Sequence, residues 1–279
     1  DTVLKPGMFR ARRKRLGQHF LTRRVAVERV VAGIAPLPGE RFLEVGPGRG
    51  ALTFPLLSAG ARVLAVEIDP SLAKSLSRRM AGEGNFEIVE GDILKVDLKG
   101  LVEHRLLRGP GVRVVGNLPY SVASPAILRL LRQTDLFADW TVMVQREVAE
   151  RILAPPGSRI FGVMTLLCSL RATCRRILEL SPSCFSPPPL VHSTLLHFVP
   201  RPSPFSSAAE EAVFERVVKA AFSARRKMLR NTLAAGLQIE VDLAEAAARA
   251  SGIHPEDRPE RVPLQGYVEL TRHLKGRIL

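Results

Sequence analysis

The sequence has 279 residues, of which 46% are hydrophobic and 24% are charged, so it can bury a sizeable core. No part of it approaches the roughly 18 uninterrupted apolar residues that a membrane-spanning helix needs, and its N-terminus lacks the apolar run of a signal peptide. Lysine and arginine outnumber aspartate and glutamate by 41 to 27, which gives a net charge of +14. These features predict a soluble, cytoplasmic protein that binds a polyanion, of which nucleic acid is the commonest.

Half of the excess positive charge lies in the first 24 residues. They contain eight lysines and arginines against one acidic residue, a local charge of +7. We expect this basic arm to contact nucleic acid phosphates through Arg12, Arg13, Lys14 and Arg15. A solvated basic tail is the alternative.

Short apolar runs alternate with helical patterns from residue 41 onward, which predicts a parallel α/β sheet. The expected strands are 41–45, 62–66, 86–89, 112–116 and 140–145, and the expected helices are about 51–59, 70–80 and 124–132. Two later runs, 174–180 and 193–199, predict antiparallel strands added at the edge of the sheet.

A stretch rich in proline and serine, 200–207, predicts a linker. Beyond it the pattern is helical, with helices expected at 209–222, 225–237, 242–250 and 263–275. We therefore expect a large α/β domain over residues 1–203 and a small all-helical C-terminal domain over residues 204–279.

The three cysteines, Cys168, Cys174 and Cys184, do not form a recognisable site. Their spacing fits neither a disulfide framework nor a CxxC metal pair. We expect ordinary thiols and no bound metal.

A glycine-rich loop, F-L-E-V-G-P-G-R-G, closes the first expected strand. Gly46 and Gly48 allow the backbone to turn sharply and to approach a ligand closely. The spacing is G-x-G-x-G behind an acidic residue, which differs from the G-x-G-x-x-G loop that binds a dinucleotide. By itself such a loop is a weak signal.

The next two strands end in carboxylates that suit a nucleoside cofactor. Glu67 can accept hydrogen bonds from both ribose hydroxyls, a role shared by NAD and S-adenosylmethionine sites. Asp92 can accept a hydrogen bond from the exocyclic amine of an adenine ring, beside apolar Ile93. Either carboxylate alone also suits a helix N-cap. Three consecutive strand ends with suitable groups favour a cofactor site.

The fourth strand ends in G-N-L-P-Y, residues 116–120. An adenine amine is a poor nucleophile because its lone pair is delocalised, so it needs orientation more than a strong base. The side-chain oxygen of Asn117 and the carbonyl of Leu118 or Pro119 can accept both N–H bonds, and Tyr120 can stack on the base. A simple turn is the alternative.

Taken together, these motifs resemble the ribosomal RNA adenine dimethyltransferase family, and within it the small-subunit branch. The similarity covers nearly the whole chain, and N-L-P-Y together with F-S-P-P-P is its most specific part. It is carried by segments 13–21, 44–50, 67–70, 91–94, 117–120, 145–152, 185–193 and 224–233.

The resemblance implies a Rossmann-like, S-adenosylmethionine-dependent methyltransferase sheet with a helical C-terminal domain. It implies dimethylation of N6 on two adjacent adenines near the 3′ end of small-subunit rRNA, with a role in ribosome biogenesis. The implied partner is this rRNA or an immature small subunit, and we expect a monomer.

The resemblance also assigns roles to individual residues. The implied cofactor contacts are His19, Leu21, Gly46, Gly48, Glu67, Asp92, Ile93 and Asn117. His19 is a departure, because many relatives have asparagine there. Phe185 resembles the aromatic residue that stacks on the target base opposite Tyr120. Leu190 stands where lysine is usual, which removes one phosphate contact.

A basic cluster in the expected helical domain is a second candidate for RNA binding. Its members are Arg225, Arg226, Lys227 and Arg230. A solvated basic face, or ion pairs with the acidic helix 209–215, is the alternative.

Three other functions stay open. A large-subunit adenine methyltransferase of the macrolide-resistance type shares the chemistry. A nucleic-acid-binding transcription or assembly factor without enzymatic activity shares the fold. A nicotinamide dehydrogenase fits less well, because the spacing of the glycine loop is wrong for it.

Overall fold

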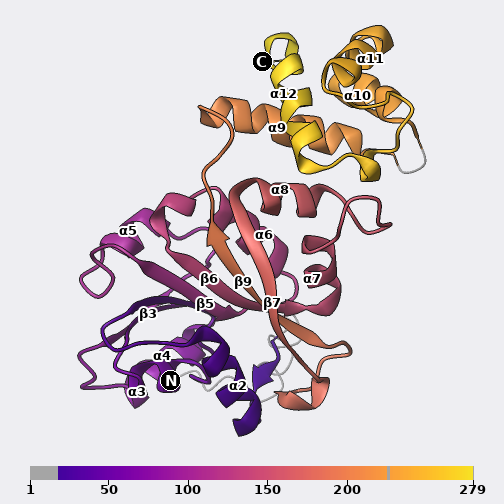
Figure 1. Cartoon of the computed structure of the whole chain (residues 1–279). Helices are drawn as coiled ribbons and strands as arrows, with labels where there is room; N and C mark the ends of the chain where they lie inside the picture. The colour runs from indigo at the N-terminus through magenta and orange to yellow at the C-terminus, as the bar shows by residue number, and fades with distance from the viewer. Residues whose placement is uncertain (1–17, 225–226, 279) are drawn as a thin grey trace, which may run out of the picture. The chain divides into compact units, whose positions relative to one another are not determined.

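The computed structural model describes residues 18–224 and 227–278 (Figure 1). By their contacts these residues form two compact units. The first holds the described residues up to Ala149 together with Cys174–Pro200, and the second holds Glu150–Thr173 together with those from Arg201 onward. The second unit thus includes a segment that we had expected in the first domain. The division into domains at residue 203 stays a prediction.

Five parallel strands form the main part of the first unit. They are β2 (Arg41–Val45), β3 (Arg62–Glu67), β4 (Phe86–Glu90), β5 (Val112–Asn117) and β6 (Asp139–Gln145). Each lies within one residue of its predicted bounds.

Two further strands extend the same sheet. β9 (Ser193–Pro200) pairs antiparallel with β6, as expected, and β7 (Ala172–Leu180) lies beyond it at the edge. The complete order is β4-β3-β2-β5-β6-β9-β7. The chain runs from β2 outward to β4 and then returns to the other side of β2 with β5. Ligands bind at this kind of switch point in open α/β sheets.

Helices cover both faces of this sheet (Figure 1). On one face lie α2 (Arg24–Ile34), α3 (Thr53–Ser58) and α4 (Pro70–Arg79), and on the other lie α5 (Leu98–Glu103) and α6 (Ala123–Leu131). Val30, Leu56 and Leu76 from the first group pack with Phe42 and Val63 of the strands in one buried apolar cluster. Burying a side chain of this size contributes about 1.5–3 kcal/mol, so the cluster fixes the strands whose ends form the site.

The start of α4 shows how the sequence sets such a boundary. The side chain of Asp69 accepts a hydrogen bond of 2.9 Å from the Ser71 backbone N–H, and Pro70 occupies the first helical position. Both features favour a helix start. They place Glu67, at the end of β3, two residues before the helix cap.

A second, two-stranded sheet was not predicted. β1 (Phe20–Leu21) pairs antiparallel with β8 (Phe185–Ser186), with Leu21 opposite Phe185. The backbone N–H of Thr22 continues the contact by donating to Cys184 O. This pairing fixes Phe20 and Leu21 against the start of the F-S-P-P-P motif, residues 185–189.

The second unit is helical. It contains α8 (Val163–Arg171), α9 (Ala208–Ala221), α10 (Leu229–Leu237), α11 (Val241–Ala250) and α12 (Leu264–Ile278), and α7 (Arg146–Ile152) lies at the boundary between the units. Phe214, Leu233, Tyr267 and Leu274 are among its fully buried side chains. The expected helix 225–237 starts at Leu229 instead. No described helix has the length and apolarity to cross a membrane.

Candidate active site

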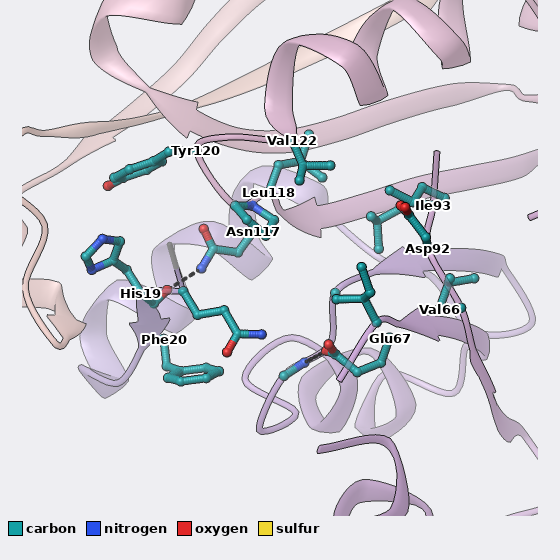
Figure 2. A pocket seen from close by; sticks show the side chains of 17 residues that line it. His19, Phe20, Val66, Glu67, Asp92, Ile93, Asn117, Leu118, Tyr120 and Val122 are labelled. Carbon is teal, nitrogen blue, oxygen red and sulfur yellow. Dashed lines mark hydrogen bonds between the residues drawn. The ribbon is translucent and has the colours of Figure 1, made fainter. Parts of the chain in front are cut away.

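A cavity lies at the carboxyl ends of β2, β3, β4 and β5, where the strand order reverses (Figure 2). Figure 2 shows Glu67 and Asp92 on one side of it, His19 and Tyr120 on the other, and Asn117 between them. Ten of the twelve residues predicted for the cofactor and the target base line it. The complete lining is Gln18, His19, Phe20, Val45, Gly46, Gly48, Val66, Glu67, Ile68, Gly91, Asp92, Ile93, Asn117, Leu118, Pro119, Tyr120 and Val122.

Glu67 is 2% exposed, and both oxygens of its carboxyl group are held by the backbone. Oε2 accepts from Gly48 N at 3.0 Å, and Oε1 accepts from Asp69 N at 3.0 Å. Burial raises the pKa of Glu67, while these two hydrogen bonds oppose the shift. Because each oxygen has further acceptor capacity, a fixed carboxyl group of this kind can hold a pair of ribose hydroxyls.

Asp92 is held at the end of β4 in a similar way. Its Oδ1 accepts a hydrogen bond of 2.9 Å from Leu94 N, which is a local capping contact. The second oxygen has no hydrogen-bond partner among the described residues, so it can accept from a ligand. Ile93 beside it is 7% exposed and gives this end of the cavity an apolar wall.

Gly48 is one of the positions where the glycine loop requires a glycine. Its φ is +56°, and a Cβ added there would lie 2.9 Å from Cε1 of Phe20. Both the left-handed backbone and the close aromatic ring therefore exclude a side chain. The loop thereby keeps the N–H of Gly48 directed at Glu67.

Asn117 ends β5 and is oriented by the segment before β1. Its Nδ2 donates a hydrogen bond of 2.8 Å to the backbone oxygen of His19. Figure 2 shows that Oδ1 consequently points to the side of Tyr120. The side chain therefore presents an acceptor, and not a donor, toward the place where a substrate amine would lie.

The structure distinguishes between the two backbone carbonyls considered as the second acceptor. Pro119 O already accepts from Val122 N at 2.9 Å and from Ala123 N at 3.0 Å. Leu118 O accepts no hydrogen bond from the described residues. Leu118 O is thus the better candidate for the second acceptor, which would act beside Asn117 Oδ1 on the same amine.

The half-buried ring of Tyr120 is held from two directions. Its hydroxyl lies 3.3 Å from Ser193 Oγ, at the start of β9, and its ring centroid lies 5.1 Å from that of His19. The His19 ring is itself fixed by a contact of 2.8 Å between Nδ1 and Pro187 O. Segment 185–193 therefore supports the N-L-P-Y loop in two ways, directly through Ser193 and indirectly through the contact of Pro187 with His19.

Leu21 and Phe185 are the two predicted residues that do not line this cavity. They pair with each other across β1 and β8 and are 5% and 4% exposed, because both side chains enter the apolar cluster under the sheet. Leu21 lines a small adjoining hollow beside the glycine loop. Stacking of Phe185 on a target base stays a prediction, and the described conformation does not present its ring to the cavity.

A family model described as ribosomal RNA adenine dimethylase matches residues 9–272. The chain belongs to this family. Its membership confirms the family predicted from the motifs, the enzymatic class and the cofactor S-adenosylmethionine. Ribosomal RNA small subunit methyltransferase A of Methylococcus capsulatus is 39% identical over 94% of this chain and 97% of its own. The protein of that name in Geobacter sulfurreducens is 40% identical over 94% of this chain and 95% of its own.

Solved structures confirm the predicted fold class of this dimethylase. A dimethyladenosine transferase from Plasmodium falciparum superimposes with a TM-score of 0.77 at 22% identity, covering 92% of this chain and 98% of the other. The 23S rRNA methyltransferase ErmE gives 0.66 at 24% identity, covering 91% and 99%. At these identities the likeness shows the fold alone, a Rossmann-like sheet with a helical C-terminal part.

The residues of the dimethylase cavity fit S-adenosylmethionine. Glu67 and Asp92 offer acceptors for a ribose and an adenine. Oε1 of Gln18 is buried at the cavity and has no hydrogen-bond partner among the described residues. A bound polar group would satisfy it.

The sequence analysis missed several lining residues, among them Gln18 and Phe20, and also Ser193, which contacts the hydroxyl of Tyr120. All three lie inside the segments that carry the family resemblance, but roles were assigned only to other residues of those segments. The position of Gln18 directly before His19 was the one local indication that it lies at the site. The contact of Ser193 with Tyr120 joins positions 73 residues apart and leaves no local pattern.

The structure describes only two of the residues predicted to contact RNA, Lys227 and Arg230. Arg12, Arg13, Lys14, Arg15, Arg225 and Arg226 lie outside the described residues. Lys227 is exposed. Arg230 instead forms an ion pair of 2.9 Å with Glu245 and lies 3.9 Å from Glu256. An intramolecular ion pair was the alternative for this cluster, although it was expected with helix 209–215.

Proposed function

We propose that this dimethylase transfers methyl groups from S-adenosylmethionine to N6 of two adjacent adenines near the 3′ end of small-subunit rRNA. The orientation of Asn117 carries the proposal. Its amide is locked by His19 O so that Oδ1 is presented as an acceptor beside Leu118 O. An exocyclic amine, which carries two N–H bonds, matches such a pair of acceptors.

The chemistry follows from holding the amine. When bound, S-adenosylmethionine supplies an electrophilic methyl group on its sulfonium. Asn117 Oδ1 and Leu118 O each accept a hydrogen bond from one of the two N–H groups. These bonds draw N6 toward tetrahedral geometry and direct its lone pair at the methyl carbon. The N–C bond forms as the S–C bond breaks, and N6 releases a proton to solvent. Positioning of this kind can lower a barrier by roughly 7–11 kcal/mol.

The second methyl transfer uses the same arrangement, but the amine then has fewer N–H groups to bind. A monomethylated amine keeps one N–H bond, so one of the two acceptors is sufficient to orient it. Tyr120 supplies the remaining constraint by stacking on the base, a contact worth about 1–3 kcal/mol. A site that depends on orientation rather than on a base can therefore repeat the reaction.

The small-subunit branch is supported by the relatives at 39% and 40% identity, both of which are named as small subunit methyltransferases. An adenine in a hairpin loop is already partly exposed, which lowers the cost of bringing it into the cavity. We propose that the substrate is this rRNA or an immature small subunit that contains it, and that Arg12 to Arg15 of the basic arm contact its phosphates. We also propose that the enzyme acts as a cytoplasmic monomer in ribosome biogenesis.

The test is transfer of labelled methyl groups from S-adenosylmethionine to undermethylated small subunits, with large subunits as the comparison and Asn117→Ala as the control. We expect both target adenines to be dimethylated, and the label to be lost in the variant. Labelling of large subunits alone would assign the protein to the resistance-type branch. Cofactor binding without any labelling would instead indicate a binding or assembly factor.

A further inference from the structure

A pair of exposed apolar side chains lies beside the site and has no part in the proposed reaction. Leu190 is 101% exposed, the highest value among the large apolar side chains of the described residues, and Val191 next to it is 40% exposed. Single exposed apolar residues are common on protein surfaces. What distinguishes this pair is where it lies and how firmly its segment is held.

The segment that carries Leu190 is fixed on both sides to the two rings at one end of the cavity. Pro187 O contacts His19 Nδ1 at 2.8 Å, and Ser193 Oγ lies 3.3 Å from the hydroxyl of Tyr120. Figure 2 shows the rings of His19 and Tyr120 next to each other. Leu190 is three residues from each anchor, and three residues span at most about 11 Å. It therefore lies close to the side of the cavity on which the proposed reaction places the target adenine.

The same segment is held in one conformation by the fold. Pro188 and Pro189 directly precede Leu190, and each fixes its backbone φ. On either side the chain enters a paired strand, β8 against β1 and β9 against β6. Just before β9, His192 O accepts a hydrogen bond of 2.9 Å from Arg146 N. A side chain on such a preformed segment binds a partner without the cost of ordering the backbone.

RNA offers a partner for apolar side chains on the faces of its bases, whereas its sugars and phosphates are polar or charged. A stacked base is covered on both faces, and removal of one base from the stack uncovers a face of its neighbour. Leucine is among the side chains that insert between opened base steps in nucleic acid complexes. An apolar pair beside the place where an adenine leaves its stack therefore fits the next base along the strand.

We propose that Leu190, supported by Val191, is an RNA-binding wedge that packs on the base next to the target adenine and replaces the stacking which that base loses. The inference rests on the proposed function and adds to it the contact that keeps the RNA open during methyl transfer. The wedge acts on the RNA and not on the cofactor, so cofactor affinity does not depend on it.

The first test is methyl transfer to undermethylated small subunits by the full chain and by variants at this position. Leu190→Ser removes the apolar surface, and Leu190→Met keeps it. We expect kcat/KM for the small subunit to fall about 10-fold or more in Leu190→Ser, the effect of one lost leucine contact. Leu190→Met should stay within about 3-fold of the parent. The melting temperature and the affinity for S-adenosylhomocysteine should be unchanged in both variants.

Leu37→Ser is the matched control. Leu37 is 61% exposed and precedes β2, at the end of the sheet opposite to the site. Its substitution removes the same apolar surface from a place that the RNA does not reach in this proposal, so kcat/KM should equal that of the parent. An equal loss in Leu37→Ser and Leu190→Ser would show a general effect of the substitution and would overturn the inference.

The second test observes the RNA directly. A protein-free hairpin with the sequence of the small-subunit 3′ end carries 2-aminopurine in place of one of the two adjacent adenines, and its fluorescence rises when the neighbouring base leaves the stack. With S-adenosylhomocysteine present, we expect a rise on binding of the parent and a smaller rise at saturating Leu190→Ser. A loss of kcat/KM on small subunits without any difference in this rise would place Leu190 against a ribosomal protein instead, and the inference would be wrong.

The remaining outcomes separate this inference from the proposed function. If the parent methylates small subunits and Leu190→Ser does so equally well, the inference alone is contradicted. A lower melting temperature of Leu190→Ser also contradicts it, because the side chain would then serve the fold. If the parent methylates neither subunit, the proposed function itself fails, and this inference fails with it.

Discussion

The side-chain nitrogen of Asn117 donates a hydrogen bond of 2.8 Å to the backbone oxygen of His19, 98 positions earlier in the chain. This bond is the reason that the amide has one defined orientation. It also means that the segment before β1 is part of the catalytic arrangement, although it contributes only a backbone atom to this contact.

Asn117→Asp tests the importance of that orientation. The substitution replaces the donor nitrogen by a second acceptor oxygen. It places negative charge against the His19 carbonyl, so the side chain should turn away. We expect kcat, measured at saturating concentrations of both substrates, to fall on the order of 10²-fold, because small misplacements at a reacting centre have effects of this size. A variant that keeps more than a tenth of the parent kcat would show that the bond to His19 does not orient the reacting group.

Tyr120 contributes a hydroxyl that contacts Ser193 and a ring that can stack on the base, and a pair of substitutions separates these two contributions. Tyr120→Phe removes the hydroxyl contact with Ser193 and keeps the ring, and Tyr120→Ala removes both. Because stacking on a base contributes about 1–3 kcal/mol, we expect kcat/KM for the RNA to fall about 5-fold to 150-fold in Tyr120→Ala. Tyr120→Phe should lose only a few-fold. Equal losses in both variants would mean that the hydroxyl, and not the ring, is what the substrate requires.

Gly48→Ala should affect both stability and cofactor binding. The residue has φ of +56°, and the new methyl group would collide with Phe20. We expect the free energy of unfolding to fall by about 1–3 kcal/mol and the affinity for S-adenosylhomocysteine to fall with it. Gly39→Ala is the control, because Gly39 has φ of +78° but no atom within 4 Å of an added Cβ. Loss of affinity in both variants would make backbone strain alone the cause.

Glu44 gives the stability of the protein a defined pH dependence. The residue is 1% exposed, its Oε2 accepts from Thr53 Oγ1 at 2.7 Å, and burial raises its pKa to about 7. The folded protein therefore binds this proton more tightly than the unfolded chain, whose carboxyl has a pKa of 4.5. Between these two values the free energy of unfolding falls as the pH rises, by at most about 3 kcal/mol.

The measurement is denaturant unfolding of the parent and of Glu44→Gln across this range. The variant should gain stability relative to the parent as the pH rises from about 4.5 to about 7, and the difference should be constant above that range. Glu83→Gln, at an exposed position, controls for the change of net charge. A difference that does not vary with pH would show that Glu44 is ionised in the folded protein throughout.

The parts of the site that the sequence predicted are those fixed by local pattern. Glu67 and Asp92 follow apolar runs of strand length, and parallel strands bring their carboxyl ends to one edge of a sheet. Once the strands were recognised, the meeting of these carboxylates with Asn117 followed from topology. The glycine loop was similarly local, because its spacing alone distinguished it from a dinucleotide loop.

The parts that escaped prediction depend on contacts between distant segments. The pairing of Leu21 with Phe185 involves two residues on each side, too few for any periodicity. Without it, the motif around Phe185 suggested an exposed stacking residue, whereas the pairing buries the ring. The bond from Arg230 to Glu245 likewise joins two helices whose packing the sequence does not specify.

Lys227 and Arg230 should contribute differently to RNA binding, although both belong to the basic cluster predicted for it. Lys227 is exposed, and Arg230 is 27% exposed and paired with Glu245. We expect Lys227→Ala to weaken small-subunit RNA binding and to lower the slope of log affinity against log salt by about 1, the effect of one lost phosphate contact. Arg230→Ala should leave that slope unchanged and lower the melting temperature, because Glu245 would lose its partner in α10. Binding measured from low to physiological salt, together with thermal unfolding, separates the two. A reduced salt slope in Arg230→Ala would mean that this arginine leaves its ion pair to meet the RNA.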